Sequence, residues 1–397
     1  MNADSPENSS RYPNLLFVMG DQWRRHSIGC MGEDPAITPN FDRFAGEGVL
    51  LERAFSCSPI CTPNRAAMLT GRHPFSMNMM HNWLRLPVEE ETISKVAGRH
   101  GYSTGFIGKW HLDAFEEGDI GDKWSNYTPR GPRRMGFDYW LATNCNHDHF
   151  RYKYMNTDEE VLEGEGWLVD YDTEAAIRWL RNDDGARDSG KPFCLYLSWA
   201  TPHNQCGGEC MDPSLPRGWA QYHAPERFER MYPADSLPVR PNADEAMYRT
   251  GAPGHFGSIT SMDENFGCLM DCLDQLGLRD NTIVVVSADH GENLGSHGLW
   301  LKDHWYEESV GIPLFIAGGP VQGAQPMCGH RVSKALVSHL DLYPTILDLA
   351  GRDMHRDQRR PGRSLLKILD ETVPGHPHVI AELATAMMIR TGNWKLV

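Results

Sequence analysis

The stretch FGSITSMDENFGCLMDCLDQLGLRDNTIVVVSADHGE, residues 256–292, contains both kinds of element from which this chain is built. Residues 256–277 repeat apolar positions with a helical period, which predicts a long amphipathic helix. Residues 281–292 begin with a run of β-branched residues, which predicts a buried strand that ends in the polar residues Asp289 and His290. A helix that leads into a buried strand is typical of an α/β fold.

The same alternation continues on the N-terminal and C-terminal sides of this stretch. Strands are predicted at 14–22, 49–55, 193–203 and 313–319, helices at 38–48, 170–182 and 337–351, and a helix, a turn and a strand within 91–109. Strands that alternate with helices predict a mainly parallel central sheet with helices on both of its faces. Functional groups of such sheets lie just beyond the carboxyl ends of the strands.

Ionisable and amide side chains follow four of the predicted strands. They are Asp21 and Gln22, Lys109 and His111, His203, and Asp289 and His290. Strand ends are solvated and collect polar residues without any function, so one such pair carries little weight. Four ends together favour a functional site at one edge of the sheet.

The composition excludes several classes of partner. A formal net charge of −15 argues against a nucleic-acid partner, whose phosphates need a basic face, and requires that cations be concentrated locally if the substrate is an anion. No apolar run approaches the roughly 20 residues of a membrane helix. The N-terminal MNADSPENSSRYPN lacks the apolar core of a signal peptide. We therefore expect a cytoplasmic protein without a membrane partner, whose ten cysteines are mostly reduced.

Two cysteines lie in the stretch CSPICTPNRAAMLTGR, residues 57–72. Only Cys61 begins the pattern Cys-x-Pro-x-Arg, and Cys57 is interpreted as a packed thiol. Thr62 and Pro63 predict that a helix starts here and runs to Gly71. A helix N-terminus favours negative charge, so we expect a lowered pKa for the Cys61 thiol.

Cys-x-Pro-x-Arg followed by AAMLTGR resembles the signature of the type I, formylglycine-dependent sulfatases of the alkaline-phosphatase-like superfamily. The resemblance extends in order to PNLLFVMGDQ, GYSTGFIGKWHL, VVVSADHGE, LKDHWYEESVGIPL and LYPTILDLAG. It implies a three-layer sandwich with a catalytic domain over 12–370. It also implies that 371–397 begins a small C-terminal antiparallel subdomain that is incomplete, because related chains continue after MIRTGNWKLV, so the chain is a fragment or its subdomain is reduced.

The resemblance implies hydrolysis of a sulfate ester to an alcohol and sulfate. Cys61 would be oxidised to formylglycine by a formylglycine-generating enzyme. The hydrated aldehyde carries two hydroxyls, of which one attacks sulfur while the other later expels sulfate and restores the aldehyde. A bound divalent metal would acidify the attacking hydroxyl.

The resemblance also implies a metal site formed by Asp21, Gln22, Asp289, His290 and the modified Cys61. Many sulfatases have Asp-Asp and Asp-Asn at these two strand ends. The Asp-Gln and Asp-His pairs of this chain resemble those of choline sulfatases and phosphonate monoester hydrolases. Oxygen ligands suit Ca²⁺, which we expect first, and the imidazole makes Mn²⁺ the alternative.

The remaining site residues are carried over by position from the same family. Arg65 would hold the oxyanion of the diol, Lys109 would neutralise the diol and sulfate, and His111 would act as a general base. His203 would lie near the leaving oxygen, Lys302 would bridge sulfate and leaving group, and Asn82 would contact substrate. Each of these residues alone has a structural alternative, although Lys109 and His111, two apart on an extended segment, would face one side.

Two patterns outside the resemblance keep two interpretations. His147, Asp148 and His149 form an HDH motif that would either contact substrate or form a surface cluster. The pairs Cys206/Cys210 and Cys268/Cys272 lack nearby partners for a zinc site.

Three functions remain open from the sequence. The first is a sulfuric ester hydrolase acting on a small anionic ester, either a sugar sulfate or a small-metabolite sulfate. The second is a phosphonate or phosphate ester hydrolase with the same residues. The third is a non-catalytic binding protein in which Cys61 stays unmodified. The oligomeric state is not predicted.

Overall fold

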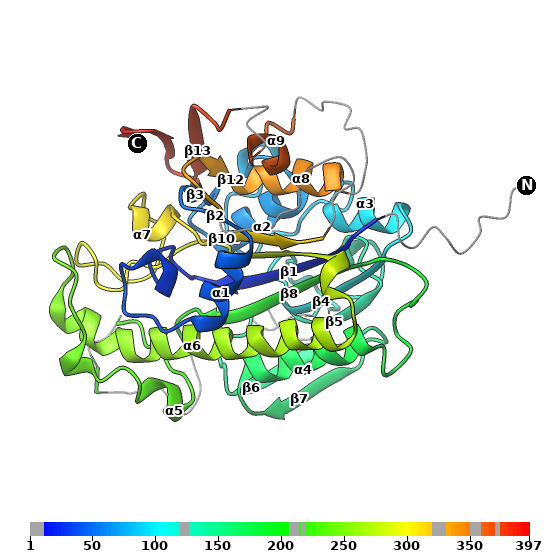
Figure 1. Cartoon of the computed structure of the whole chain (residues 1–397), viewed down its shortest axis with the longest axis horizontal. Coiled ribbons are helices and arrows are strands. Elements are labelled where there is room, and N and C mark those ends of the chain that lie inside the picture. Colours follow the sequence, from blue (N-terminus) through cyan, green and yellow to red (C-terminus); the bar gives the residue numbers. More distant parts are fainter. Residues whose placement is uncertain are drawn as a thin grey trace, which may run out of the picture.

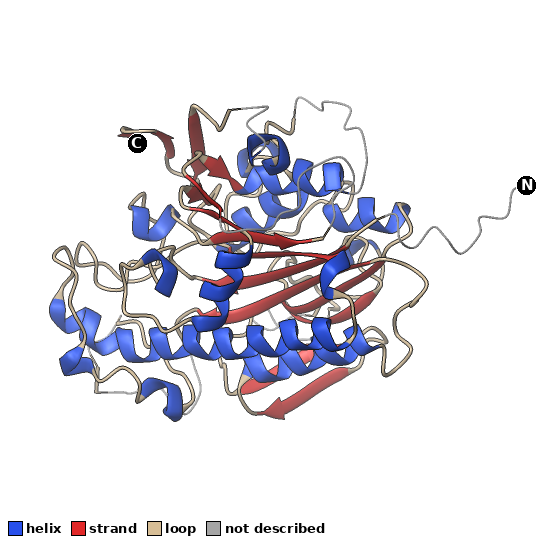
Figure 2. Ribbon diagram, viewed as in Figure 1, coloured by secondary structure: helices blue, strands red, loops and turns tan. Residues whose placement is uncertain are grey.

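The computed structural model describes residues 12–119, 127–205, 214–215, 219–319, 331–349, 359–369 and 374–397. Its centre is a ten-stranded sheet with the strand order β11-β2-β10-β9-β1-β8-β4-β5-β6-β7 (Figures 1 and 2). The strands are β1 Asn14–Asp21, β2 Val49–Leu51, β4 Ser103–Lys109, β5 Tyr139–Thr143, β6 Arg151–Met155, β7 Val161–Glu165, β8 Phe193–Pro202, β9 Thr282–Ala288, β10 Leu314–Gly318 and β11 Arg331–Ser333.

The middle of this sheet is parallel. Strand β1 pairs in parallel with both β8 and β9, and β4 pairs in parallel with β8 and β5. Strand β10 is antiparallel to its neighbours β9 and β2, and β6 and β7 form an antiparallel edge. Every residue of β1, β8 and β9 is buried, because both faces of a central parallel strand are covered.

Helices cover both faces of the sheet, as Figure 1 shows. One layer contains α1 Pro39–Glu47, α4 Leu168–Arg181, α5 Glu226–Glu229 and α6 Glu245–Gln275, and the first three of these helices pack on α6. The opposite layer contains α2 Cys61–Thr70, α3 Ile93–Arg99, α8 Leu342–Leu349 and α9 Leu365–Leu369. Helix α7 spans Glu307–Val310. The predicted three-layer α/β fold is confirmed.

Several predicted bounds differ from the structure. Helix α6 begins at Glu245 rather than at 256, with Asp244 as its N-cap and Pro253 inside it. Gly254 permits this extension, because a Cβ there would lie 1.9 Å from the carbonyl oxygen of Tyr222. The predicted strand 49–55 is divided into β2 and the short β3 Ala54–Phe55. The predicted helix 337–351 begins as strand β12 Val337–Ser338 and a 3₁₀ turn, so α8 starts only at Leu342.

The C-terminal residues form a separate three-stranded antiparallel sheet. Its strands are β13 His378–Glu382, β14 Met387–Thr391 and β15 Lys395–Leu396. Val379, Ala381 and Met388 pack in a small core with Phe55 and Val310. The C-terminal antiparallel element is therefore present, and the division of the chain at residue 370 stays a prediction. Among the described residues, none of the helices has the length and apolarity that a membrane crossing requires.

Candidate active site

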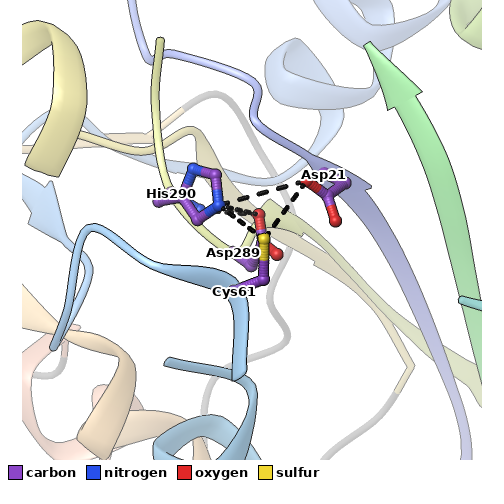
Figure 3. A group of neighbouring side chains, drawn as sticks. All are labelled: Asp21, Cys61, Asp289 and His290. Carbon is purple, nitrogen blue, oxygen red and sulfur yellow. Dashed lines mark hydrogen bonds and ion pairs between the residues drawn. The ribbon is translucent and has the colours of Figure 1, made fainter. Parts of the chain in front are cut away.

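The carboxyl ends of two adjacent parallel strands bring the first site residues together. Strands β1 and β9 pair up to Gly20 and Ala288, so Asp21, the last residue of β1, and Asp289, the first residue after β9, lie at neighbouring positions. Ligand atoms of Asp21, Cys61, Asp289 and His290 all lie within 4.8 Å of one another, and all four residues are buried (Figure 3). The predicted convergence at this edge of the sheet is thus present in the structure.

Cys61 reaches this cluster because it is the first residue of α2. Its Sγ lies 3.1 Å from His290 Nε2, 3.8 Å from Asp21 Oδ1 and 3.5 Å from Lys302 Nζ. The expected lowered thiol pKa is wrong. Complete burial, with the Asp21 carboxylate as the next cause, raises the pKa of Cys61 to about 12, and this outweighs the attraction of the cations Lys302 and Lys109.

Cys57 lies outside the cluster, as expected of a packed thiol. It is fully buried against Ala67 and Leu340, and its Sγ is 3.3 Å from Ser338 Oγ. Its backbone N–H donates to Asn64 Oδ1 at 2.8 Å. The two cysteines of the signature stretch therefore face different environments.

Arg65 binds the two aspartates at once. Its Nε donates to Asp289 Oδ2 at 2.9 Å and its Nη2 donates to Asp21 Oδ2 at 2.9 Å. Its Nη1 donates to the carbonyl oxygen of Lys109 at 2.7 Å and to Ser198 Oγ at 2.8 Å. Because a guanidinium has five N–H donors, these bonds leave one donor for any further acceptor.

Lys109 forms a second buried ion pair with the same carboxylate. Its Nζ lies 2.6 Å from Asp21 Oδ2, and both side chains are fully buried. Burial by itself would raise the pKa of Asp21, but the neighbouring cations, Lys109 first and then Arg65 and Lys302, hold it well below its usual value. Asp21 is therefore ionised and available as a metal ligand.

Lys302 and His203 meet close to Cys61. Lys302 Nζ lies 2.7 Å from His203 Nε2 and donates to Gln22 Oε1 at 2.6 Å. Burial, followed by Lys302 and His147, lowers the pKa of His203 well below its usual value, so this imidazole is neutral. Because Nδ1 faces the carbonyl oxygen of Asn204 at 2.7 Å, the ring proton is on Nδ1 and Nε2 accepts from Lys302.

His111 presents a buried imidazole without a hydrogen-bond partner on either nitrogen among the described residues. Its backbone has a φ of 53°, and its ring contacts the Trp83 ring edge to face at 4.9 Å. Burial, followed by Lys109 and Arg65, lowers its pKa well below the usual value. A neutral histidine with two free nitrogens next to these cations fits the predicted place beside a bound anion.

Asn82 occupies a structural position at the same helix start. Its Oδ1 accepts from the Thr62 backbone N–H at 3.0 Å, which satisfies a donor in the first turn of α2. Its predicted contact with substrate stays a prediction.

The HDH motif is not a surface cluster. The His147 ring lies 4.3 Å from the His203 ring, and its Nε2 is 2.8 Å from Cys145 Sγ. His149 is 1% exposed, and neither of its ring nitrogens has a partner among the described residues. Of the two interpretations of the motif, the structure therefore favours a place at the site for His147. The prediction that Cys206 and Cys210 do not form a zinc site is not tested, because both residues lie outside the described part of the chain.

Sequence reasoning missed two residues that hold the site residues in place. Ser198 on β8 accepts from Arg65 and donates to the Lys109 carbonyl oxygen at 2.8 Å. Glu292 accepts from Gln22 Nε2. The signal for Glu292 was its place in the strand-end sequence ADHGE, whereas nothing in the buried run of β8 distinguishes Ser198.

The donor set fits a divalent cation. Two carboxylates, an imidazole and the side chain of residue 61 lie within 4.8 Å of one another, and Arg65 and Lys109 already share the charge of the carboxylates. The Gln22 amide oxygen lies beside this group, 2.6 Å from Lys302 Nζ. Oxygen and imidazole donors suit Ca²⁺ and Mn²⁺.

Comparison with known proteins agrees with this geometry. A sequence model of the Sulfatase family matches residues 13–352. An ulvan-active sulfatase from Formosa agariphila is 35% identical over 344 residues, which cover 85% of this chain and 61% of that protein. An endo-4-O-sulfatase from Bacteroides thetaiotaomicron is 29% identical over 374 residues, covering 86% of this chain and 70% of that protein.

Solved structures show the same relation. A structure reported with the metabolism of multiple glycosaminoglycans by Bacteroides thetaiotaomicron has a TM-score of 0.85 and 27% identity, and the match covers 97% of this chain and 86% of that one. Here the fold, the strand-end aspartates and the cysteine at the start of α2 coincide with a family match over most of the sequence. The chain belongs to the sulfatase family.

Proposed function

We propose that the protein hydrolyses a sulfate ester to an alcohol and inorganic sulfate at the cluster around Cys61. The observation that carries the proposal is the meeting of Asp21, Cys61, Asp289 and His290 within 4.8 Å in a sulfatase-family chain. The cysteine of the family signature lies among potential metal ligands, whereas Cys57 is packed elsewhere.

The cluster is suited to an anion although the protein is acidic. The formal net charge is −15, so long-range attraction does not deliver a sulfate ester. Arg65, Lys109 and Lys302 bring three buried cations to the site, of which Lys302 lies 3.5 Å from Cys61 Sγ. Charge-assisted hydrogen bonds are strongest in such a desolvated place.

The nucleophile belongs to the finer part of the proposal. A formylglycine made from Cys61 by a formylglycine-generating enzyme, with a bound Ca²⁺ or alternatively Mn²⁺, would supply an acidified oxygen nucleophile. Asp21, Gln22, Asp289 and His290 would hold the cation. His111, whose ring nitrogens have no hydrogen-bond partner in the described part of the chain, would accept the proton whose removal releases sulfate.

Departure of the alcohol would depend on Lys302 and His203. Their nitrogens lie 2.7 Å apart and share one hydrogen, so the pair holds a proton next to Cys61. It would donate to the leaving oxygen, where negative charge develops in the transition state. Lys109 and Lys302 would bind sulfate oxygens, and Asn82 would contact substrate.

A sugar sulfate is the substrate class that the relatives favour. One relative is named an ulvan-active sulfatase and another an endo-4-O-sulfatase. The match spans 61% and 70% of the length of these two proteins, so their substrate class is a proposal for this chain. A small-metabolite sulfate is the alternative, and a phosphonate or phosphate ester is the second candidate for the same residues.

The test compares chemistry and modification on one preparation. An aldehyde-reactive probe followed by peptide mapping should label residue 61 and leave Cys57 unlabelled. The same preparation should hydrolyse an aryl sulfate faster than the matched aryl phosphonate, and Cys61→Ala should be inactive. Label on Cys57, or activity that survives in Cys61→Ala, would contradict the proposed nucleophile. Faster hydrolysis of the aryl phosphonate would favour the second candidate, a phosphonate or phosphate ester hydrolase, over the sulfatase reaction.

A further inference from the structure

Glu292 is a buried carboxylate beside the site to which the proposed chemistry assigns no role. It is 0% exposed and lies three residues after Asp289. Its Oε1 accepts from the backbone N–H groups of Leu294 and Leu301, both at 2.8 Å, and its Oε2 accepts from Gln22 Nε2. Within the described part of the chain no ion pair to Glu292 is found, and the three donors that it accepts from are all N–H groups.

These contacts determine which way the Gln22 amide points. A carboxylate only accepts hydrogen bonds, so it selects the nitrogen end of the amide. Asn204 Oδ1, 3.4 Å from the same Nε2, makes the same selection. The amide oxygen must then face away from Glu292, and it accepts from Lys302 Nζ at 2.6 Å.

The same carboxylate also holds the backbone that carries Lys302. Leu301, whose N–H it binds, immediately precedes Lys302 and has a left-handed φ of 64°. Gln22 likewise has a φ of 64°, and its N–H donates to Asp289 Oδ1 at 3.0 Å. Side chains rarely adopt this conformation without support from their surroundings, and Glu292 bonds to both segments.

We propose that Glu292 is a positioning residue, which directs Gln22 Oε1 toward the proposed cation and holds Lys302 against it. The inference rests on the proposed function, because it assigns Gln22 and Lys302 their orientation for that site. The alternative is that Glu292 only closes the loop between 292 and 301, which would leave the cation site insensitive to the chemistry of residue 292.

Glu292→Gln separates the two possibilities because it keeps shape and removes one acceptor. If its oxygen stays with the Leu294 and Leu301 N–H groups, its NH₂ faces Gln22 Nε2, and the Gln22 amide must turn its own NH₂ toward Lys302 and the cation. We expect Ca²⁺, or Mn²⁺ if that is the ion bound, to bind about 10- to 100-fold more weakly. Calorimetric titration of the metal-free full chain measures this.

Gln22→Glu supplies the rescue. In Glu292→Gln, a carboxylate at position 22 would accept from the new NH₂ and present its other oxygen to the cation. In the unaltered background it would face the Glu292 carboxylate. The gain in cation affinity from Gln22→Glu should therefore be larger when Glu292→Gln is present. This double variant also serves where Glu292→Gln alone does not fold, since it restores the match of donor and acceptor.

The matched control is Glu308→Gln. Glu308 is 5% exposed and accepts from Asn242 Nδ2 at 2.9 Å, without touching Gln22 or Lys302, so cation affinity should not change. Unchanged cation binding in Glu292→Gln, or a double variant that neither folds nor binds, overturns the inference while sulfate hydrolysis by the unaltered chain still stands. An unaltered chain that binds no cation overturns the proposed metal chemistry and this inference together.

Discussion

Replacing Arg65 by alanine should lower the melting temperature of the metal-free protein strongly. Arg65 makes 2.9 Å bonds to carboxylate oxygens of both Asp21 and Asp289. Asp21 keeps Lys109 as a partner, but Asp289 Oδ2 loses its donor in a fully buried place. Breaking a buried charge pair by removing one partner costs about 3–5 kcal/mol.

This free energy converts into a measurable shift. For a cooperative unit of 397 residues the unfolding entropy is roughly 0.8 kcal/mol/K, so the melting temperature should fall by about 4–6 °C. Arg65→Lys should recover only part of this, because a single ammonium does not reproduce the planar fork of donors. Calorimetry in the presence of a chelator measures both variants.

Arg227→Ala is the control for this experiment. Arg227 pairs with Glu264 at 2.8 Å, but the two side chains are 61% and 52% exposed. Exposed pairs contribute about 0–1 kcal/mol, so the melting temperature should change by roughly 1 °C or less. If Arg65→Ala destabilises the protein no more than Arg227→Ala does, the reasoning from buried charge is refuted.

Three further predictions concern the proposed reaction. Lys302→Ala and His203→Ala should reduce turnover by about 100-fold or more for esters with poor leaving groups, and by less for activated aryl esters. Turnover over a series of esters of graded leaving-group pKa measures this. An equal loss across the series would show that neither residue assists departure of the alcohol. Asp289→Ala should abolish both cation binding and turnover, since it removes a ligand from the cluster; a folded variant that retains one cation in elemental analysis would count against the proposed site. His147→Ala should lower kcat/KM by roughly 2- to 10-fold, because the His203 ring loses its neighbour at 4.3 Å and one aromatic contact contributes a free energy of about this size. Unchanged kinetics would show that His147 plays no part in the reaction.

Residue types and their spacing were sufficient for the fold class and for the expectation that polar strand-end residues meet at one edge of the sheet. The apolar runs of β1, β8 and β9 are buried throughout, so their hydrophobicity alone marks them as central strands. The Cys-x-Pro-x-Arg pattern identified the start of α2 and distinguished Cys61 from Cys57. Polar residues after strands indicated one edge of the sheet, because parallel strands end there together.

The edge strands and the first turns of α6 required tertiary contacts. Strands β6 and β7 are short, contain charged residues and are partly exposed, so in sequence they resemble loops, but they pair at an open edge of the sheet. Pro253 and Gly254 argue locally against a helix. The helix continues through them because it packs against Tyr222. The two backbones approach so closely there that position 254 must be a residue without a side chain, which accounts for the unfavourable glycine.

The electrostatics of the site could be decided only by the folded chain. A helix start predicts an acidified thiol at Cys61. Burial of the start of α2, together with the Asp21 carboxylate, instead raises the pKa of this thiol. The sequence identified Arg65, Asp21 and Asp289 separately, but it did not show that Arg65 joins the two aspartates, which are separated from each other by most of the chain. Likewise, the sequence does not show that Glu292 contacts Gln22, a residue far away in the chain. Local sequence determines which groups are available, and the order of strands in the sheet determines which of them meet and how much water surrounds them.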